Sequence, residues 1–195
     1  NRAVKELTEI GRLDRVQGVG TFVANFTATA PLFEIQSIRG EIEFRDEVYE
    51  CSVLSVGRKT VCHEEAIRTG IEPGDQCYLE AVHYADGVPL QLERRHVNSA
   101  IAPFFIKQDF TRVTASDYLL RHVPYTEVKH TVNAISADEI VGEHLNLKRG
   151  APCLSLTRQT LSHEHVITHV ELIHPGDKFS LSGRFAGSSA MSQVA

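Results

Sequence analysis

Residues 76–98 read QCYLEAVHYADGVPLQLERRHVN and contain two apolar-alternating runs on either side of Ala85-Asp86-Gly87. A period of two is typical of a strand that buries one face, and Asp-Gly is a preferred dipeptide of tight hairpin turns. The stretch therefore predicts two antiparallel strands joined by a short turn. A second hairpin is predicted over residues 153–177, which read CLSLTRQTLSHEHVITHVELIHPGD.

Helical patterns and further strands surround these hairpins. Helices are predicted over 32–47, with Gly40 as a potential break, over 62–70, 102–110 and 116–123, and after Ser136 or Asp138, which are candidate N-caps. Strands are predicted over 48–56, 128–135 and 179–185. Because the helices are interspersed among hairpins, the expected class is α+β, with a largely antiparallel sheet and flanking helices.

The first 31 residues have a different organisation. Apolar spacing predicts a short helix from Asn1 to Ile10, and GRLDRVQGVGTFVA then predicts a glycine-tipped hairpin, so the two together have the form of a wing. NFTATAP has the small polar composition of a linker. The expected divisions are a helix-and-wing segment over 1–24, a linker over 25–31, a main domain over 32–185 and a disordered tail over 186–195.

Composition is that of an ordinary globular protein. The 195 residues are 42% hydrophobic with a net charge of −5, so any DNA contact must be local. No apolar run approaches the ~18 residues of a membrane span, and the N-terminal residues lack the plan of a signal peptide, so we expect a cytoplasmic protein. Cys51, Cys62, Cys77 and Cys153 form no C-x-x-C pair, and buried or idle thiols are expected.

Residues 15–24, RVQGVGTFVA, resemble the R-x-Q-G-x-G-T-[FY]-V-A wing that closes the DNA-binding domain of GntR-superfamily repressors. NRAVKEL is similar to the end of their recognition helix, so the earlier helices of a winged helix-turn-helix are expected to be absent from this chain. The remainder resembles the UTRA sensor domain of the HutC branch, through YADGVPLQLERRHVN, SDY and HPGDKFSL. The resemblance implies a chorismate-lyase-like sheet and a ligand-responsive transcription repressor, not an enzyme.

Within the HutC branch, the resemblance is strongest in QLERRHVN, IAPFFIKQDF and LIHPGDKF. It implies an effector, urocanate, the first product of histidine breakdown, together with operator DNA and a second copy of the chain as partners, and no membrane. Two alternatives remain: a sensor for another small carboxylate or a sugar, and an enzyme related to chorismate lyase, because fold does not decide function. The wing favours the repressor, since an enzyme needs none.

The wing carries the expected contacts with DNA. Arg15 offers a cation, and the backbone amides near Gly18 and Gly20 can approach phosphates or a minor groove closely because glycine has no side chain. On spacing alone, the alternative is a simple tight turn. The resemblance adds Arg2 and Gln17 to this DNA-binding set.

The first hairpin carries a predicted effector site. Glu93 and Arg95 share one face of the returning strand because strands alternate, and His83 and Tyr84 lie near them on the incoming strand. Arginine can hold a carboxylate through two N–H groups, and glutamate can accept from an imidazole N–H. The alternative is a cross-strand ion pair on a solvated face. Sugar-phosphate sensors of the family tend to have an R-x-R pair where this chain has Ala81 and His83, which favours a small carboxylate.

Two further pairs complete the predicted site. Ser116 and Tyr118 place hydroxyl groups at a helix start, where free N–H groups could receive an anion, although Ser116 could equally be a plain N-cap. The resemblance implies that Thr168 and His174 face the ligand, while His174 could equally be a core histidine.

The tract SHEHVITH, residues 162–169, contains the ligand types of a zinc site. It lies at a predicted hairpin tip and lacks the paired spacing of established zinc motifs, so a solvated loop is expected, with no metal and no cofactor. No G-x-S-x-G, H-E-x-x-H or glycine-rich phosphate loop occurs, so the sequence predicts no catalytic residue.

Overall fold

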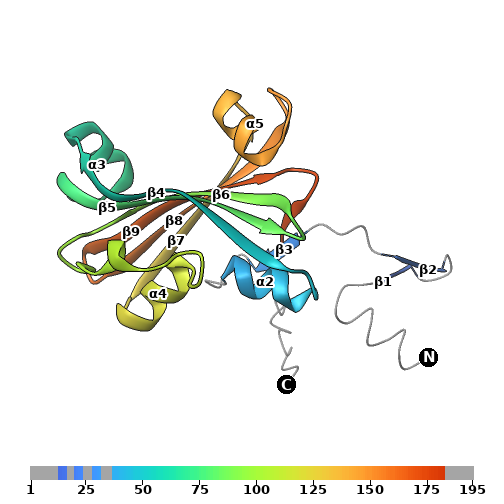
Figure 1. Cartoon of the computed structure of the whole chain (residues 1–195), viewed down its shortest axis with the longest axis horizontal. Coiled ribbons are helices and arrows are strands. Elements are labelled where there is room, and N and C mark those ends of the chain that lie inside the picture. Colours follow the sequence, from blue (N-terminus) through green and yellow to red (C-terminus); the bar gives the residue numbers. More distant parts are fainter. Residues whose placement is uncertain (1–12, 17–19, 24–27, 32–36, 183–195) are drawn as a thin grey trace, which may run out of the picture.

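The computed structural model describes residues 13–16, 20–23, 28–31 and 37–182. At its centre is a six-stranded sheet with the order β4-β5-β6-β9-β8-β7 (Figure 1). Its strands are β4 Tyr49–Val61, β5 Gly74–Ala85, β6 Val88–Val97, β7 Glu127–Ser136, β8 Pro152–Ser162 and β9 His165–Pro175. Every neighbouring pair is antiparallel, which confirms the predicted α+β class.

Within the described ranges, four α-helices flank this sheet, two on each face (Figure 1). One face is covered by α2 (Ile38–Phe44) and α4 (Ala115–His122), and the other by α3 (His63–Thr69) and α5 (Glu139–Leu145). A single 3-10 turn, η1 (Phe105–Lys107), is all that is helical in the region predicted as a helix over 102–110. None of the described helices has the length and apolar character needed to cross a bilayer.

The order of elements repeats, because α2-β4-α3-β5-β6 is followed by α4-β7-α5-β8-β9. Ser37 at the start of α2 and Thr114 at the start of α4 are 77 positions apart in the chain, and their hydroxyl oxygens lie 3.0 Å apart. Each half forms a three-stranded meander, and the two join where β6 pairs with β9, with Arg94 opposite Glu171. The halves are therefore related by a pseudo-two-fold axis between β6 and β9.

The backbone of the turns explains the two hairpins. Asp86 (φ 49°) and Gly87 (φ 74°) are both left-handed, as a type I′ turn requires. His163 (φ 53°) begins the turn between β8 and β9. Both predicted hairpins are confirmed, and Gly70 (φ 69°) ends α3 as expected.

Two predicted boundaries differ from the structure. The helix predicted over 32–47 begins at Ile38, because Ser37 is extended, and Gly40 lies inside α2 without breaking it; residues 32–36 lie outside the described ranges. The strand predicted to end at Val56 continues to Val61, because β4 keeps pairing with β5 to that point.

The wing hairpin is present as two paired strands. β1 (Leu13–Val16) and β2 (Gly20–Val23) pair antiparallel, as predicted. The helix predicted for the first ten residues, the hairpin tip at 17–19 and the tail at 186–195 lie outside the described ranges.

The segment predicted as a linker, 25–31, contains a strand. β3 (Ala28–Pro31) pairs in parallel with β10 (Phe179–Ser182). Four residues of the predicted linker are thus paired with a strand distant in sequence, and the division into domains at this segment stays a prediction.

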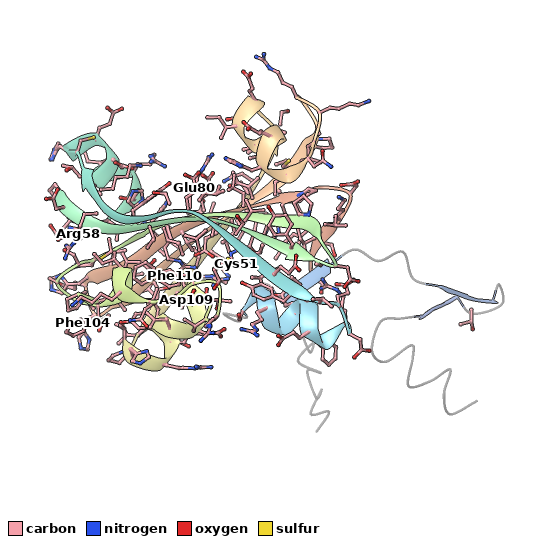
Figure 2. All side chains as sticks on the ribbon, viewed as in Figure 1. Cys51, Arg58, Glu80, Phe104, Asp109 and Phe110 are labelled. Carbon is pink, nitrogen blue, oxygen red and sulfur yellow. The ribbon has the colours of Figure 1, made fainter. Side chains whose placement is uncertain are left out.

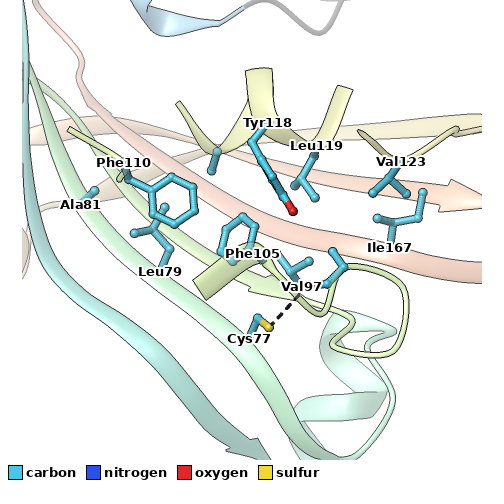
Figure 3. Close-up of a cluster of buried hydrophobic side chains, with 12 residues drawn as sticks. Cys77, Leu79, Ala81, Val97, Phe105, Phe110, Tyr118, Leu119, Val123 and Ile167 are labelled. Carbon is cyan, nitrogen blue, oxygen red and sulfur yellow. Dashed lines mark hydrogen bonds between the residues drawn. The ribbon is translucent and has the colours of Figure 1, made fainter. Parts of the chain in front are cut away.

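Apolar side chains fill the space between the sheet and both helical layers (Figure 2). On the α4 face, the centroid of the Phe105 ring lies 4.7 Å from that of Phe110 and 5.9 Å from that of Tyr118. The Tyr118 side chain points from α4 toward the sheet (Figure 3). On the other face, Leu145 of α5 packs in a cluster with Leu92. The sheet thus has a core on each side.

Gly142, inside α5, generates a test of this packing. A Cβ at Gly142 would lie 2.9 Å from the carbonyl oxygen of Leu147, whose N–H bonds back to Gly142. We expect Gly142→Ala to lower the free energy of unfolding by about 1–3 kcal/mol, because a backbone atom must move. Gly40→Ala, at an exposed helical glycine with nothing within 4 Å, should raise it by roughly 0.5–1 kcal/mol. Urea unfolding measures both, and an alanine at 142 that leaves stability unchanged contradicts the close contact.

Candidate effector site

A row of buried ionic side chains crosses the sheet on the face covered by α2 and α4. Glu93 of β6 accepts a hydrogen bond from Arg95 Nε at 2.5 Å and is bonded to His83 Nε2 of β5 at 2.9 Å. All three residues are 2% exposed. The prediction that Glu93 and Arg95 share a face is confirmed, whereas the alternative of a solvated ion pair is excluded by this burial.

The charges of this row stabilise one another. Burial opposes ionisation of Glu93, but the Arg95 charge and the bond to His83 lower its pKa to about 2. Burial also opposes protonation of His83, but hydrogen bonds to Cys51 and Glu93 outweigh it and raise its pKa to about 9. The Tyr49 hydroxyl oxygen lies 2.9 Å from His83 Nδ1 and accepts the Nδ1–H of the protonated ring. At neutral pH the row therefore contains an imidazolium, a carboxylate and a guanidinium.

Arg95 extends from this row toward α4 and β9. Its Nη2 donates to Ser116 Oγ at 3.1 Å, and its Nη1 lies 3.4 Å from Thr168 Oγ1. Thr168 is itself fixed, because its hydroxyl donates to the carbonyl of His96 at 2.9 Å. The guanidinium is thus held in one position by a carboxylate and two hydroxyls.

Ser116 does not cap the helix. Thr114 takes that role, accepting from the N–H of Asp117 at 3.1 Å, while the Asp117 carboxylate accepts from Thr114 and Ser37. The predicted alternative of Ser116 as a plain N-cap is therefore wrong. The Ser116 hydroxyl is left to face Arg95.

A small cavity opens beside Arg95, with free space for about one water molecule as its side chains stand. Polar groups line one part of it, and apolar side chains of α4 and β9 line the rest. Its polar lining is Arg95, Ser116, Arg158, Thr160 and Thr168. Its other lining residues are Leu119, Leu120, Val123, Tyr125 and Ile167. An apolar lining with a few convergent polar groups is the kind of lining that small-molecule sites have.

Arg158 of β8 is a functional candidate that sequence reasoning missed. It is 5% exposed, and its Nε donates to His130 Nε2 at 2.9 Å. Burial, followed by repulsion from Arg95, lowers its pKa to about 10. The sequence did contain a signal for this residue. Arg158 alternates with Leu156 and Thr160, so all three lie on the same buried face of the strand. An arginine on a buried face is costly unless its charge is compensated.

The structure brings together five of the eight residues predicted for the effector site, His83, Glu93, Arg95, Ser116 and Thr168. Tyr84 packs in the cluster on the α5 face, because neighbouring residues of a strand point to opposite faces and His83 faces the site. The remaining two, Tyr118 and His174, belong to the core.

Tyr118 and His174 have packing partners of their own. Tyr118 is 8% exposed within the Phe105 cluster (Figure 3). The His174 ring stacks on Phe179 with centroids 3.5 Å apart, and neither nitrogen has a well-formed hydrogen bond, the Leu90 backbone being at most a weak partner. Burial lowers the pKa of His174 to about 3, so the ring is neutral.

The histidine tract is spread along β9. His163 and His165 are exposed at the turn, and His169 is buried further along the strand. Within the ranges that the structure describes, no three His, Cys, Asp or Glu side chains are grouped as metal ligands.

His83 gives the fold a specific pH dependence. A histidine whose pKa rises from 6.5 to about 9 on folding adds stability that is full below pH 6.5 and is lost as pH rises through 9. We expect the free energy of unfolding to fall by roughly 3 kcal/mol over that interval and the fall to be absent in His83→Gln. Urea unfolding at pH 6 to 9.5 measures it, with exposed His165→Gln as control. Equal pH dependence in wild type and His83→Gln would refute the charged state of His83.

Known proteins are similar to this chain in sequence and in fold. The family model for the UTRA domain matches residues 45–180. Histidine utilization repressors of Pseudomonas aeruginosa and Pseudomonas putida are 41% and 42% identical to the chain over 187 residues, covering 95% of this chain and 75% of each relative. These relatives are repressors, which removes the alternative of a lyase-like enzyme.

Solved structures agree with this relationship. The C-terminal domain of the histidine utilization repressor from Pseudomonas syringae pv. tomato has a TM-score of 0.68 and 35% identity, over 72% of this chain and 100% of that domain. PhnF from Mycobacterium smegmatis has a TM-score of 0.76 over 95% of this chain and 83% of its own, but at 19% identity it shows the fold alone. By sequence and by fold, the chain belongs to the UTRA-domain family, among the histidine utilization repressors of the GntR superfamily.

Proposed function

We propose that this chain senses urocanate and, through a winged helix-turn-helix, regulates genes of histidine breakdown in response. The observation that carries the proposal is the cavity in which Arg95, Arg158 and Ser116 face an apolar wall. Urocanate is a planar carboxylate with an unsaturated chain and an imidazole ring, so it matches both parts of that lining.

The charges around the cavity favour an anion. The positive groups, Arg95, Arg158 and protonated His83, outnumber the ionised Glu93 in a region shielded from water. Uncompensated positive charge is costly where the dielectric constant is low, so an entering carboxylate gains more there than at the surface. Two guanidinium groups and a hydroxyl supply the donors it needs.

The apolar wall favours a planar carboxylate over a sugar phosphate as the ligand. Leu119, Val123 and Ile167 offer no hydrogen bonds, so sugar hydroxyls placed there would lose water without replacement. A flat unsaturated chain loses nothing. This supports the carboxylate, in agreement with Ala81 and His83 standing where sugar-phosphate sensors tend to have arginines.

Glu93 acts in this proposal as a positioning residue. Its two oxygens are bonded to His83 and to Arg95. We therefore assign the direct effector contacts to Arg95, Arg158, Ser116 and Thr168, and assign Glu93 and His83 to holding Arg95 in place.

DNA binding forms the second half of the proposal. The paired β1 and β2 strands support a wing in which Arg15 and Gly20 contact operator DNA, together with Arg2, Gln17 and Gly18. A repressor that reads chromosomal DNA works in the cytoplasm, and the effector concentration there is what it would sense.

Urocanate should stabilise the protein. At a concentration one hundred times the dissociation constant, we expect about 2.7 kcal/mol of added stability, whereas glucosamine 6-phosphate should give far less. Thermal-shift and calorimetric titrations measure this. A larger response to the sugar phosphate, or none to urocanate, would overturn the choice of ligand.

Adjacent arginines on opposite faces of β6 provide a matched pair of variants. Arg95→Gln and the milder Ser116→Ala should weaken urocanate binding roughly tenfold or more, because charge-assisted bonds to the carboxylate are lost. Arg94→Gln, which breaks the 2.9 Å bond to Glu80 on the other face, should leave binding unchanged. Because Arg95→Gln also leaves Glu93 with one partner fewer, ligand-free unfolding is measured in parallel. Undiminished binding by both Arg95→Gln and Ser116→Ala would exclude this carboxylate site.

A homodimer is expected, since helix-turn-helix repressors read two half-sites with two copies of one chain. Light scattering at micromolar concentration should give twice the 21.7 kDa of the chain. A mass of one chain at that concentration would contradict this expectation.

A further inference from the structure

The sheet has a second polar hollow, which is separate from the candidate effector site. Its volume is about 180 Å³, and its lining comes from α3 and from three strands, β7, β8 and β9. The lining residues are Arg68, Lys129, Thr131, Thr157, Gln159 and His169. None of these side chains is acidic, and none of them lines the cavity beside Arg95.

Strand alternation places the hollow and the cavity on opposite faces of the sheet. In β8, Arg158 lines the cavity and the next residue, Gln159, lines the hollow. In β9, Thr168 lines the cavity and the next residue, His169, lines the hollow. The side-chain amide of Gln159 donates to the Thr69 carbonyl at 2.8 Å, so the hollow lies under the end of α3, on the face opposite α4 (Figure 1).

His169 is the buried member of the hollow. It is 7% exposed, and its Nδ1 is shielded from solvent without a hydrogen bond. No residue that the structure describes is hydrogen-bonded to its ring. Burial, followed by repulsion from Arg68 and His96, lowers its pKa to about 4, so the ring is neutral and keeps one N–H. A buried N–H without an acceptor is costly, unless a ligand accepts it.

The cations around the hollow are incompletely neutralised. Arg68 and Lys59 approach the same carboxylate oxygen of Glu65, at 3.7 Å and 3.8 Å, which is too long for a well-formed hydrogen bond. One carboxylate charge is thus shared between two cations. Lys129, on the edge strand β7, has no carboxylate within 4 Å among the residues that the structure describes. The hollow therefore carries an excess of positive charge.

We propose that this hollow binds a small tetrahedral oxyanion of the phosphate or sulfate type. Arg68 supplies a charge from α3 and Lys129 supplies one from β7, while His169 supplies its ring N–H. The hydroxyls of Thr131 and Thr157, which are opposite each other in the β7–β8 pairing, add two donors. Donors that come from a helix and three strands match an ion whose oxygens point in several directions. A planar carboxylate would meet fewer of them.

An NMR titration with inorganic phosphate at pH 7.5 and constant ionic strength tests the proposal. The imidazole C2–H signal of His169, assigned through His169→Gln, and the amide signal of Thr131 should shift and saturate. The midpoint should lie in the millimolar range, because water screens the exposed cations. The amide signal of Ser116, in the candidate effector site, should stay in place. Sulfate should act like phosphate, and acetate should bind several-fold more weakly.

Variants of the two cations give a matched comparison. Lys129→Gln and Arg68→Gln should each weaken phosphate binding roughly threefold or more, because each removes a charge-assisted bond that water partly screens. The double variant should show no saturable shift. Lys148→Gln, which changes an exposed lysine in the loop after α5, should bind phosphate as wild type does. Arg68 and Lys129 are themselves exposed, so their replacement should not prevent folding.

Three results would overturn the proposal. The first is phosphate binding that survives unchanged in the double variant. The second is a shift that grows linearly with phosphate concentration, or that appears at Ser116 in place of His169. The third is acetate binding as tight as that of phosphate, which would exclude a site built for a tetrahedral ion.

Discussion

The buried carboxylate of Glu93 is the interaction on which the rest of the site depends. It lies in the strand next to the pseudo-two-fold axis, bonded on one side to His83 and on the other to Arg95. A buried ion is tolerated only when its charge is matched and its oxygens are hydrogen-bonded. If His83 or Arg95 moved away, the Glu93 carboxylate would be left buried without a full set of partners, which is energetically costly. Arg95 consequently reaches the cavity in a fixed orientation, and Ser116 and Thr168 complete its set of acceptors.

The sequence predicts the parts of this arrangement that depend on near neighbours. Asp86-Gly87 specifies the hairpin, and strand alternation places Glu93 and Arg95 on one face. Tyr84 follows His83 directly in β5, so the same alternation turns it to the opposite face and away from the site. Arg158 was missed for a different reason: it reaches the cavity because β9 pairs with both β8 and β6, which joins segments far apart in the chain.

The repeated topology explains why the site lies where it does. Two halves with the same order of elements meet at β6 and β9, so the first helices of both halves, α2 and α4, converge on the same face. The two helices contribute differently: α4 places the Ser116 hydroxyl in the lining of the cavity, whereas none of the residues that line it comes from α2. A symmetric scaffold thereby surrounds an asymmetric space, which suits a ligand whose two ends differ in chemistry.

The parallel pairing of β3 with β10 gives the sensor a seam where its entering and leaving strands run side by side. A domain whose first and last strands are adjacent can be combined with different preceding domains in evolution. The new domain needs only to end in a strand that pairs with β10 as β3 does. For the same reason, substitutions in Phe179–Ser182 would alter how the UTRA domain is joined to the segment before it, although these residues lie outside the lining of the candidate effector site. Evolution can thus change the response of such a regulator without changing the molecule it recognises.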